Sequence, residues 1–335
     1  MEKRKERVDR GIKVRAESIY LISSYQEMLY LILPRLSIFI FFLLFPIFLS
    51  PFPYWHKVFI MSSVFVLLSL VFDFLANFVG LVCLGLAFFV GVGGYISAVL
   101  NTKLGLSPYL CVPIASVLGS LFCTLLLLPT LSLRGIYFAI VTLMYPLLMV
   151  RIIEALNILG GTNGIVGVEG FGNKWGECYF LTIFCLIFLF GLRRLVHEDI
   201  GLVIRAVKEN DQSVKASGIS PFHVRVFSLL IASFIGSFAG AYISHLYMWA
   251  GLSLFALDFS ILPIVATVIG SGGTLFGPLL GSVIIIPLSE VLREFGSLRI
   301  AIYSLILTFV IVFKSEGIFS YISRKYQQFE RWVEV

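Results

Sequence analysis

The sequence predicts an all-helical, polytopic membrane protein with about ten transmembrane helices, within a range of eight to ten. The chain is 59% hydrophobic and only 13% charged, and its mean hydropathy is +0.99. This composition is typical of membrane proteins and excludes an ordinary soluble domain. The apolar stretches are continuous, as in "IFIFFLLFPIFL", whereas the strands of a membrane β-barrel alternate apolar and polar residues. Because backbone polar groups must be satisfied within the hydrocarbon, such stretches indicate helices.

Ten apolar stretches are long enough to be considered membrane-spanning, since a helix needs about 20 mostly apolar residues to cross the hydrocarbon core. Together they form a transmembrane domain over residues 32–314. The eighth and ninth are short and rich in glycine, so they could be broken or re-entrant. The expected spans are residues 32–50, 58–75, 78–100, 109–128, 135–153, 178–194, 222–247, 257–271, 277–293 and 299–314.

The distribution of basic residues predicts the orientation of the chain. Lys and Arg are enriched on the cytoplasmic side of membrane proteins, so the basic N-terminal tail, residues 1–31, is placed in the cytoplasm. Ten crossings place the C-terminal tail, residues 315–335, on the same side, and 19 of the 25 Lys and Arg residues then lie inside. We therefore interpret the basic tail as an orientation signal that lies against membrane lipid, and not as an arm that binds nucleic acid.

One polar segment, residues 205–220 with the sequence "RAVKENDQSVKASGIS", interrupts the apolar stretches and faces the cytoplasm in this topology. Its pattern predicts a short amphipathic helix that Gly218 ends, after which Ser220 and Pro221 begin the next span. The apolar side of this helix needs a surface, which is either the underside of the bundle or another protein. That side is expected to contain Val203, Val207 and Val214.

The same segment resembles the cytoplasmic coupling loop of ABC importer permeases, in which a short helix ending in Gly docks on the ATPase subunit. Three further stretches resemble, in the same order, the branched-chain amino acid permeases of the LivM type. They are "LRGIYFAIVTLMYPLLMVR" from Leu133, "LGGTNGIVGVEGF" from Leu159 and "VIGSGGTLFGPLLGSVIIIPLSEVLR" from Val268. The resemblance covers about residues 60–322.

This resemblance implies an ABC importer permease fold in the cytoplasmic (inner) membrane of a prokaryote. The chain would form a transport pathway together with a second, related permease subunit. Two ATPase subunits would bind inside, and an extracytoplasmic solute-binding protein would deliver a branched-chain or related amino acid. Within the coupling loop, residues 195–221, the resemblance points to Arg205, Glu209, Asp211 and Gly218 as the residues that couple the chain to the ATPase.

ATP would be used by the partner subunits, because this chain contains no Gly-Lys dipeptide and therefore no Walker A loop. We accordingly expect a transporter subunit with no enzymatic activity and no cofactor of its own. The histidines have no zinc-site spacing, and the cysteines lie in or beside apolar stretches, where Cys behaves as a small hydrophobic residue. The cysteines are Cys83, Cys111, Cys123, Cys178 and Cys185.

Regularly spaced glycines mark helices that either pack closely or line the pathway. Gly273, Gly277 and Gly281 fall at positions i, i+4 and i+8, and Gly236 and Gly240 repeat the spacing. On a helix such glycines form a smooth stripe that lets another helix approach closely. Close packing is the more common use of this pattern, and direct contact with the solute is the alternative.

A glycine-rich external loop follows residue 154. Its glycines and asparagines supply the positive backbone φ angles that tight turns need. A flexible connector and a compact cap or docking surface for an external partner remain equally open. The residues expected to shape such a surface are Gly160, Gly161, Asn163 and Gly164.

Two other transport functions also remain open: a gradient-driven secondary transporter or channel-like protein for a small solute, and an ABC permease for urea or another small polar solute. A membrane enzyme is disfavoured, because no paired carboxylates or histidine cluster offers chemistry. Five ionisable residues lie near predicted span ends, where hydration removes most of the cost of a charge, which weakens a proton-relay interpretation. They are Asp73, Arg151, Glu154, Asp258 and Glu290.

Overall fold

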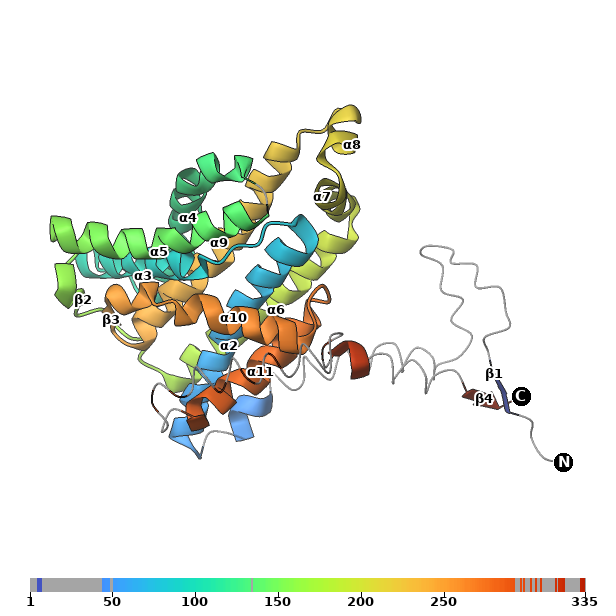
Figure 1. The fold of residues 1–335 in the computed structure, drawn as a ribbon. Helices are drawn as coiled ribbons and strands as arrows, with labels where there is room; N and C mark the ends of the chain where they lie inside the picture. Colours follow the sequence, from blue (N-terminus) through green and yellow to red (C-terminus); the bar gives the residue numbers. More distant parts are fainter. Residues whose placement is uncertain are drawn as a thin grey trace.

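The described part of the chain is a bundle of long α-helices with two short strand pairs (Figure 1). β1 (Lys5–Arg7) pairs antiparallel with β4 (Trp332–Glu334), and β2 (Ile165–Val166) pairs antiparallel with β3 (Trp249–Ala250). The prediction of a helical membrane protein is therefore confirmed. This computed structural model describes residues 5–7, 44–48, 51–133, 135–292, 296, 298, 302, 305, 308, 317, 319–322 and 332–334.

Seven helical segments among these residues are long and apolar enough to cross a membrane, and an eighth apolar helix, α11 (Phe276–Val291), is shorter with 16 residues. These eight helices correspond to the second to ninth predicted spans. The first and tenth predicted spans, residues 32–50 and 299–314, lie largely outside the described residues. The seven long segments are Pro53–Val79, Leu86–Leu104, Pro108–Ser132, Ile136–Leu156, Lys174–His197, Pro221–Leu246 and Leu252–Gly270.

The central span consists of α2 (Pro53–Asp73), which continues directly into a π-helix, η2 (Phe74–Val79). Within an apolar stretch of 18 residues in this span, 94% of the residues are buried inside the protein, so α2 forms the middle of the bundle. Gly80 ends the π-helix in a left-handed conformation with φ of 81°, which a residue without Cβ adopts readily. The chain then reverses into α3 (Leu86–Leu104).

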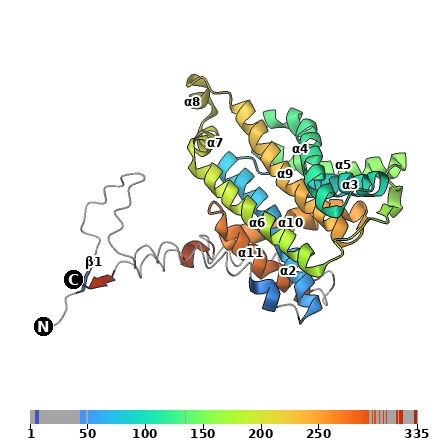
Figure 2. The same ribbon diagram turned by 180° about the vertical axis from the view of Figure 1, so that it is seen from behind.

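The next four elements of the chain include the least buried span. They are α4 (Pro108–Leu127), the 3₁₀-helix η3 (Leu128–Ser132), α5 (Ile136–Leu156) and α6 (Lys174–His197). In α5, only 28% of the residues in an apolar stretch of the same length are buried, so one long face of this helix is open to its surroundings. α6 packs along α2, on the side seen in Figure 2.

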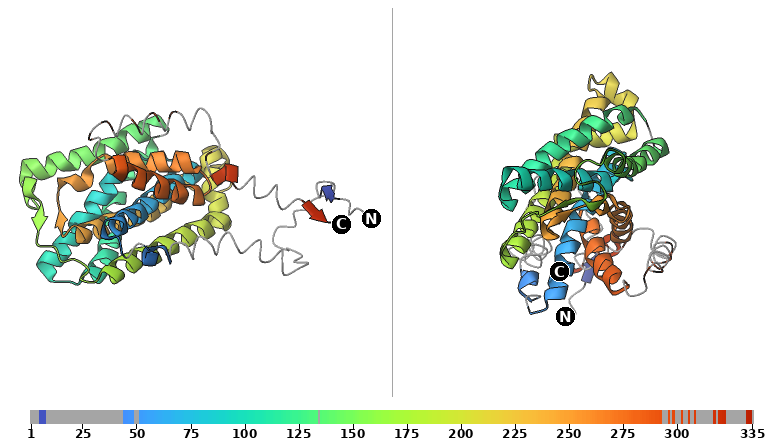
Figure 3. Two further views of the ribbon diagram at one scale, coloured as in Figure 1. Left: turned by 90° about the horizontal axis from the view of Figure 1, so that it is seen from below. Right: turned by 90° about the vertical axis from the view of Figure 1, so that its left-hand side faces the viewer.

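The second half of the bundle begins with a short polar segment and ends with a helical hairpin. α7 (Asp199–Glu209) and α8 (Asp211–Ala216) precede the long helix α9 (Pro221–Leu246). The 3₁₀-helix η5 (Leu252–Phe255) then leads to α10 (Asp258–Gly270), which pairs with α11 beside α2. The α7–α8 segment and the β2–β3 pair lie at opposite ends of the bundle (Figures 1 and 3).

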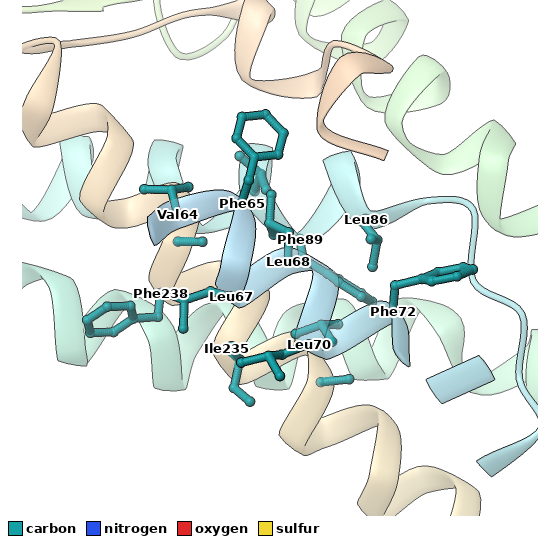
Figure 4. Close-up of a cluster of buried hydrophobic side chains, with 14 of the residues drawn as sticks. Val64, Phe65, Leu67, Leu68, Leu70, Phe72, Leu86, Phe89, Ile235 and Phe238 are labelled. Carbon is teal, nitrogen blue, oxygen red and sulfur yellow. The ribbon is translucent and has the colours of Figure 1, made fainter. Parts of the chain in front are cut away.

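Buried apolar side chains from α2, α3 and α9 form one contiguous core (Figure 4). The α2 side chains contact both neighbours because nearly the whole circumference of this helix is buried. Burial on all sides is expected for a helix at the centre of a large apolar bundle. The residues labelled in Figure 4 are Val64, Phe65, Leu67, Leu68, Leu70, Phe72, Leu86, Phe89, Ile235 and Phe238.

α9 approaches α3 so closely that glycine is required at the contact. A Cβ added to Gly240 would overlap the carbonyl oxygen of Val90, and a Cβ added to Gly236 would lie 2.7 Å from the Cβ of Phe89. From the α3 side, a Cβ on Gly93 would overlap the backbone of Ser237. Gly236 and Gly240 therefore lie where α9 packs directly on α3.

We expect Gly240→Val to destabilise the detergent-solubilised protein by about 1–3 kcal/mol, because the branched side chain would collide with backbone atoms of α3. The thermal unfolding midpoint measures this effect. Gly191→Val is the matched control, since a Cβ at Gly191 on α6 meets no other atom within 4 Å. Equal changes in the midpoint for both variants would contradict the packing role of Gly240.

Candidate functional site

The polar segment folds as two helices and not as the single amphipathic helix that its pattern predicts. The break is at Asn210, whose backbone is extended (φ −154°, ψ 104°) between α7 and α8. The Asn210 side-chain oxygen accepts hydrogen bonds from the backbone N–H groups of Gln212 (2.9 Å) and Ser213 (3.3 Å). Asn210 is thus the N-cap of α8. Because an N-cap residue has a non-helical backbone, α7 cannot continue through Asn210 and ends at Glu209.

The apolar side of this segment packs against the bundle of the same chain. Val207 and Val214 are 2% and 5% exposed, and Val203 is partly buried, so the valines predicted to share one side do so. Ile204 adds a further buried side chain to this contact. The structure therefore answers the question that the pattern left open for these valines, since the surface they cover is the underside of the bundle.

Gly218 has the capping role that the sequence predicts. Its φ is +81°, its N–H donates to the carbonyl of Lys215 (3.0 Å), and the N–H of Ile219 donates to the carbonyl of Val214 (3.2 Å). These paired bonds form a Schellman motif, which ends a helix on a left-handed residue. Ser220 is the N-cap of α9, as predicted, although its side chain makes no capping bond.

The charged residues predicted for coupling point in different directions. Glu209 is exposed at the end of α7. The Arg205 guanidinium donates to the carbonyl of Val196 (3.2 Å) and lies 5.5 Å from the centre of the Phe78 ring. Asp211 is buried, and both of its carboxylate oxygens accept from Arg225 at 2.8 Å. Asp211 therefore holds α8 against α9, because its buried charge requires this partner.

Two exposed apolar residues on α7 escaped the sequence reasoning. Ile200 and Leu202 are 53% and 61% exposed, although α7 is otherwise charged on its outer side. The pattern carried this signal for Leu202, which falls away from the valine side of the helix, but not for Ile200, which shares the i, i+3, i+7 spacing of Val203 and Val207. Exposed apolar side chains are one mark of contact sites for partners, and Ile219 and Phe222, which follow α8, are exposed as well.

A polar pocket of about 320 Å³ lies beside the α7–α8 segment. It is bounded by the connection after the π-helix, by the connection before α5 and by the two short helices. The charged side chains on its wall come in both signs. They are Lys208, Glu209, Asp211 and Arg225.

The glycines of the α10–α11 hairpin divide into two roles. A Cβ on Gly281 would overlap the carbonyl oxygen of Ala266, and one on Gly277 would overlap that of Ser271, so these two glycines let α11 approach α10. The predicted i, i+4, i+8 stripe is wrong for Gly273, because α11 begins only at Phe276. Gly273 instead lies in the turn between the helices, with φ of 81°.

The glycine-rich loop after residue 154, which the sequence predicts to be external, is compact. Gly160, Gly161 and Gly164 all have positive φ angles, and the 3₁₀-helix η4 (Gly161–Asn163) lies between them. The indole N–H of Trp249 donates to the carbonyl of Asn163 (3.0 Å), and β2 follows directly to pair with β3. Of the two alternatives for this loop, the structure favours the compact cap over the flexible connector.

The five ionisable residues near span ends lie in different environments. Arg151 and Glu154 form an exposed ion pair of 2.9 Å, and Asp258 is exposed, as expected of hydrated positions. Glu290 is partly buried. The expectation is wrong for Asp73, whose side chain is fully buried where α2 meets the π-helix.

The cysteines and potential metal ligands show no reactive constellation in the described ranges. All five cysteines are free thiols and buried, as the apolar sequence context predicts. Within those ranges, no three His, Cys, Asp or Glu side chains gather closely enough to hold a metal ion. The features that remain for function are therefore the polar α7–α8 segment, the opposite loop and the helices between them.

Comparisons with known proteins agree with this architecture. The LivM permease protein of the high-affinity branched-chain amino acid transport system of Salmonella typhimurium is 25% identical over 289 residues, which cover 77% of this chain and 68% of the relative. The Escherichia coli K12 counterpart is 24% identical with the same coverage. A probable LivM permease of Methanocaldococcus jannaschii is 28% identical over 223 residues, or 58% of this chain and 63% of the relative.

No solved structure matches the chain. The sequence family described as the permease component of branched-chain amino acid transport systems matches residues 55–314, which contain every helix from α3 to α11. The chain therefore belongs to this family of permease components, the membrane-spanning subunits of ABC importers.

Proposed function

We propose that the chain transports branched-chain or related amino acids inward as one permease subunit of an ATP-driven importer in a prokaryotic cytoplasmic membrane. The observation that carries this proposal is the family match over residues 55–314, which includes the α7–α8 segment. The relatives named above are permeases for branched-chain amino acids, which supports this class of solute. A second, related permease would complete the pathway.

The α7–α8 end of the bundle is the cytoplasmic end in this proposal. Arg194, Arg205, Lys208 and Lys215 all lie at this end, and basic residues are enriched on the cytoplasmic side. The β2–β3 pair at the opposite end then faces outward (Figure 3). The sequence predicts a cytoplasmic position for the two tails as well, residues 1–31 and 315–335.

Two ATPase subunits bind at the cytoplasmic end, one of them on the α7–α8 segment of this chain. α7 is already buried against the bundle through Ile204 and Val207, while Ile200 in its first turn and Leu202 on its opposite side remain exposed. A helix with one apolar side against its own protein and another in water suits contact with a second protein. Glu209 and Arg205 flank this contact, and ATP stays on the partner subunits.

The external solute-binding protein docks on the compact loop at the other end. The left-handed glycines and the Trp249–Asn163 hydrogen bond hold this loop in one shape, so docking costs little ordering of the chain. ATP-driven closure of the two ATPases would push on α7 and change which end of the pathway is open. Movement of α7 would be transmitted to the membrane helices because α7 packs against α6, α9 and the π-helix.

We expect Gly218→Val to lower ATP-driven leucine uptake strongly, because a β-branched residue with φ near +81° is strained by about 1–2 kcal/mol and would distort the end of α8. Leucine uptake into membrane vesicles measures this. Gly218→Asn should retain most uptake, since Asn adopts the left-handed conformation more easily. Normal uptake by Gly218→Val would refute the capping role in coupling.

The Leu202→Asp variant tests the ATPase contact. Because Leu202 is 61% exposed, the change should leave the thermal unfolding midpoint unaltered but lower recovery of the ATPase in a mild-detergent pull-down. Leu104→Asp is the matched control, since Leu104 is 65% exposed at the opposite end of the bundle. Absence of any ATPase from the wild-type pull-down, with uptake driven by an ion gradient, would favour a gradient-driven transporter instead.

For the external loop, we expect the double variant Asn163→Ala, Gly164→Ala to lower leucine uptake about fivefold, equivalent to about 1 kcal/mol of lost docking energy. The reason is steric, because a Cβ on Gly164 would overlap the carbonyl oxygen of Ala250 and φ is +72° there. ATPase recovery should be unchanged. Undiminished uptake would count against the docking role of this loop.

A further inference from the structure

Asp73 is a buried carboxylate inside a membrane span. It is the last residue of α2, and its exposed fraction is 0%. One carboxylate oxygen accepts from the backbone N–H of Gly273 (2.6 Å) and from the side-chain amide of Asn77 (2.7 Å), and the other accepts from the backbone N–H of Leu275 (3.0 Å). Because an intramembrane charge is costly, a carboxylate retained with three donors indicates a function.

The two backbone donors belong to the turn that joins α10 and α11. Ser271, Gly273 and Leu275 have φ angles of 105°, 81° and 60°, and the first and last of these are unusual for residues with a side chain. Strained turns persist when their surroundings determine them, and the Asp73 carboxylate supplies such a constraint. Asp73 therefore fixes the position of the α10–α11 hairpin relative to α2.

On its other side, Asp73 adjoins the π-helix, which contacts α7. The Lys208 ammonium donates to the backbone carbonyl of Asn77 (2.8 Å). A Cβ on Gly80 would lie 2.9 Å from the Lys208 side chain, so these segments touch closely. The Arg205 guanidinium lies over the ring of Phe78. The π-helix is thus the surface of the central span against which α7 rests.

Asn77 joins the two contacts. Its side chain donates to Asp73, and its backbone carbonyl accepts from Lys208. The segment between them is π-helical, a rare conformation that occurs frequently at functional sites. α7 is therefore connected to the turn of the α10–α11 hairpin by consecutive hydrogen bonds, from Lys208 to Asn77, from Asn77 to Asp73 and from the turn to Asp73.

We propose that Asp73 and Asn77 form a relay through which movement of α7 repositions the α10–α11 hairpin during transport. This inference rests on the proposed function, because an ATPase must move α7. Asp73 and Asn77 are positioning residues in this mechanism, and neither needs to touch the solute. The hairpin moves as one unit, since Gly277 and Gly281 pack its two helices backbone against backbone.

The test uses the complete importer complex in proteoliposomes, with Asp73→Asn as the first variant. The asparagine keeps the size of the side chain but places an NH₂ donor against an N–H donor of the turn. We expect ATP hydrolysis within about twofold of wild type, together with leucine uptake lowered about tenfold. A purely structural loss would lower both activities and the recovery of the ATPase.

A second variant, Lys208→Met, tests the same relay without altering the buried carboxylate. Lys208 is exposed and contacts the bundle through the Asn77 carbonyl, so the variant should fold, and ATPase recovery is measured beside both activities because Lys208 lies on the docking segment. Uptake per ATP hydrolysed should fall, as for Asp73→Asn. Lys103→Met is the matched control, because Lys103 is exposed at the external end of α3 and should leave both activities unchanged.

Spin labels report the movement directly. The exposed positions Ile284 on α11 and Leu121 on α4 can each be replaced by cysteine and labelled, since the five native cysteines are buried. ATP should change the distance between the labels in the wild-type background and leave it unchanged in Asp73→Asn and Lys208→Met. The relay would be overturned if both variants kept full uptake, or if ATP changed the distance between the labels in both variants as much as in the wild type. Either result would leave the importer function standing. A wild-type complex without ATPase would overturn the proposed function itself.

Discussion

Direct backbone contact between helices is the constraint on which the rest of this bundle depends. In a membrane, helices gain no hydrophobic energy from leaving lipid for protein, so association relies on close van der Waals packing. Gly240 meets the Val90 carbonyl, and Gly281 meets that of Ala266, so glycine sets the separation at both the α3–α9 and α10–α11 interfaces. α2 lies between these two pairs and packs against both. The position of every functional segment follows from this arrangement.

Polar contacts then connect the elements that glycine packing brings together. Asp211 and Arg225 tie α8 to α9, and Asp73 ties α2 to the turn after α10. Both carboxylates are almost inaccessible to water, so their partners must come from the protein. These contacts concentrate at the end of the bundle that carries α7 and α8. The α7–α8 segment, which transmits force in the proposed function, is thereby linked to the bundle by directional bonds as well as by apolar contact.

Much of the fold was predictable because its signals are local. Continuous apolar stretches predicted eight helices of the described region, and Gly218 and Ser220 marked the ends of α8 and the start of α9. Other features depended on geometry that local patterns do not carry. Asn210 divides the polar segment because its side chain caps a second helix, and Gly273 leaves the predicted glycine stripe because a carboxylate 200 residues away binds its turn.

The sequence by itself determined that this protein is a helical membrane permease, because hydrophobic length, basic-residue asymmetry and family motifs are all written along the chain. It also determined where the polar segment of residues 205–220 lies and how that segment ends. Only the tertiary structure decided which charges of this segment are exposed and which pair inside the protein. Glu209 and Asp211 are two residues apart, yet one is exposed and the other is buried against Arg225. That difference arises because burial and pairing of a charge depend on neighbouring helices, which the linear order of residues does not specify.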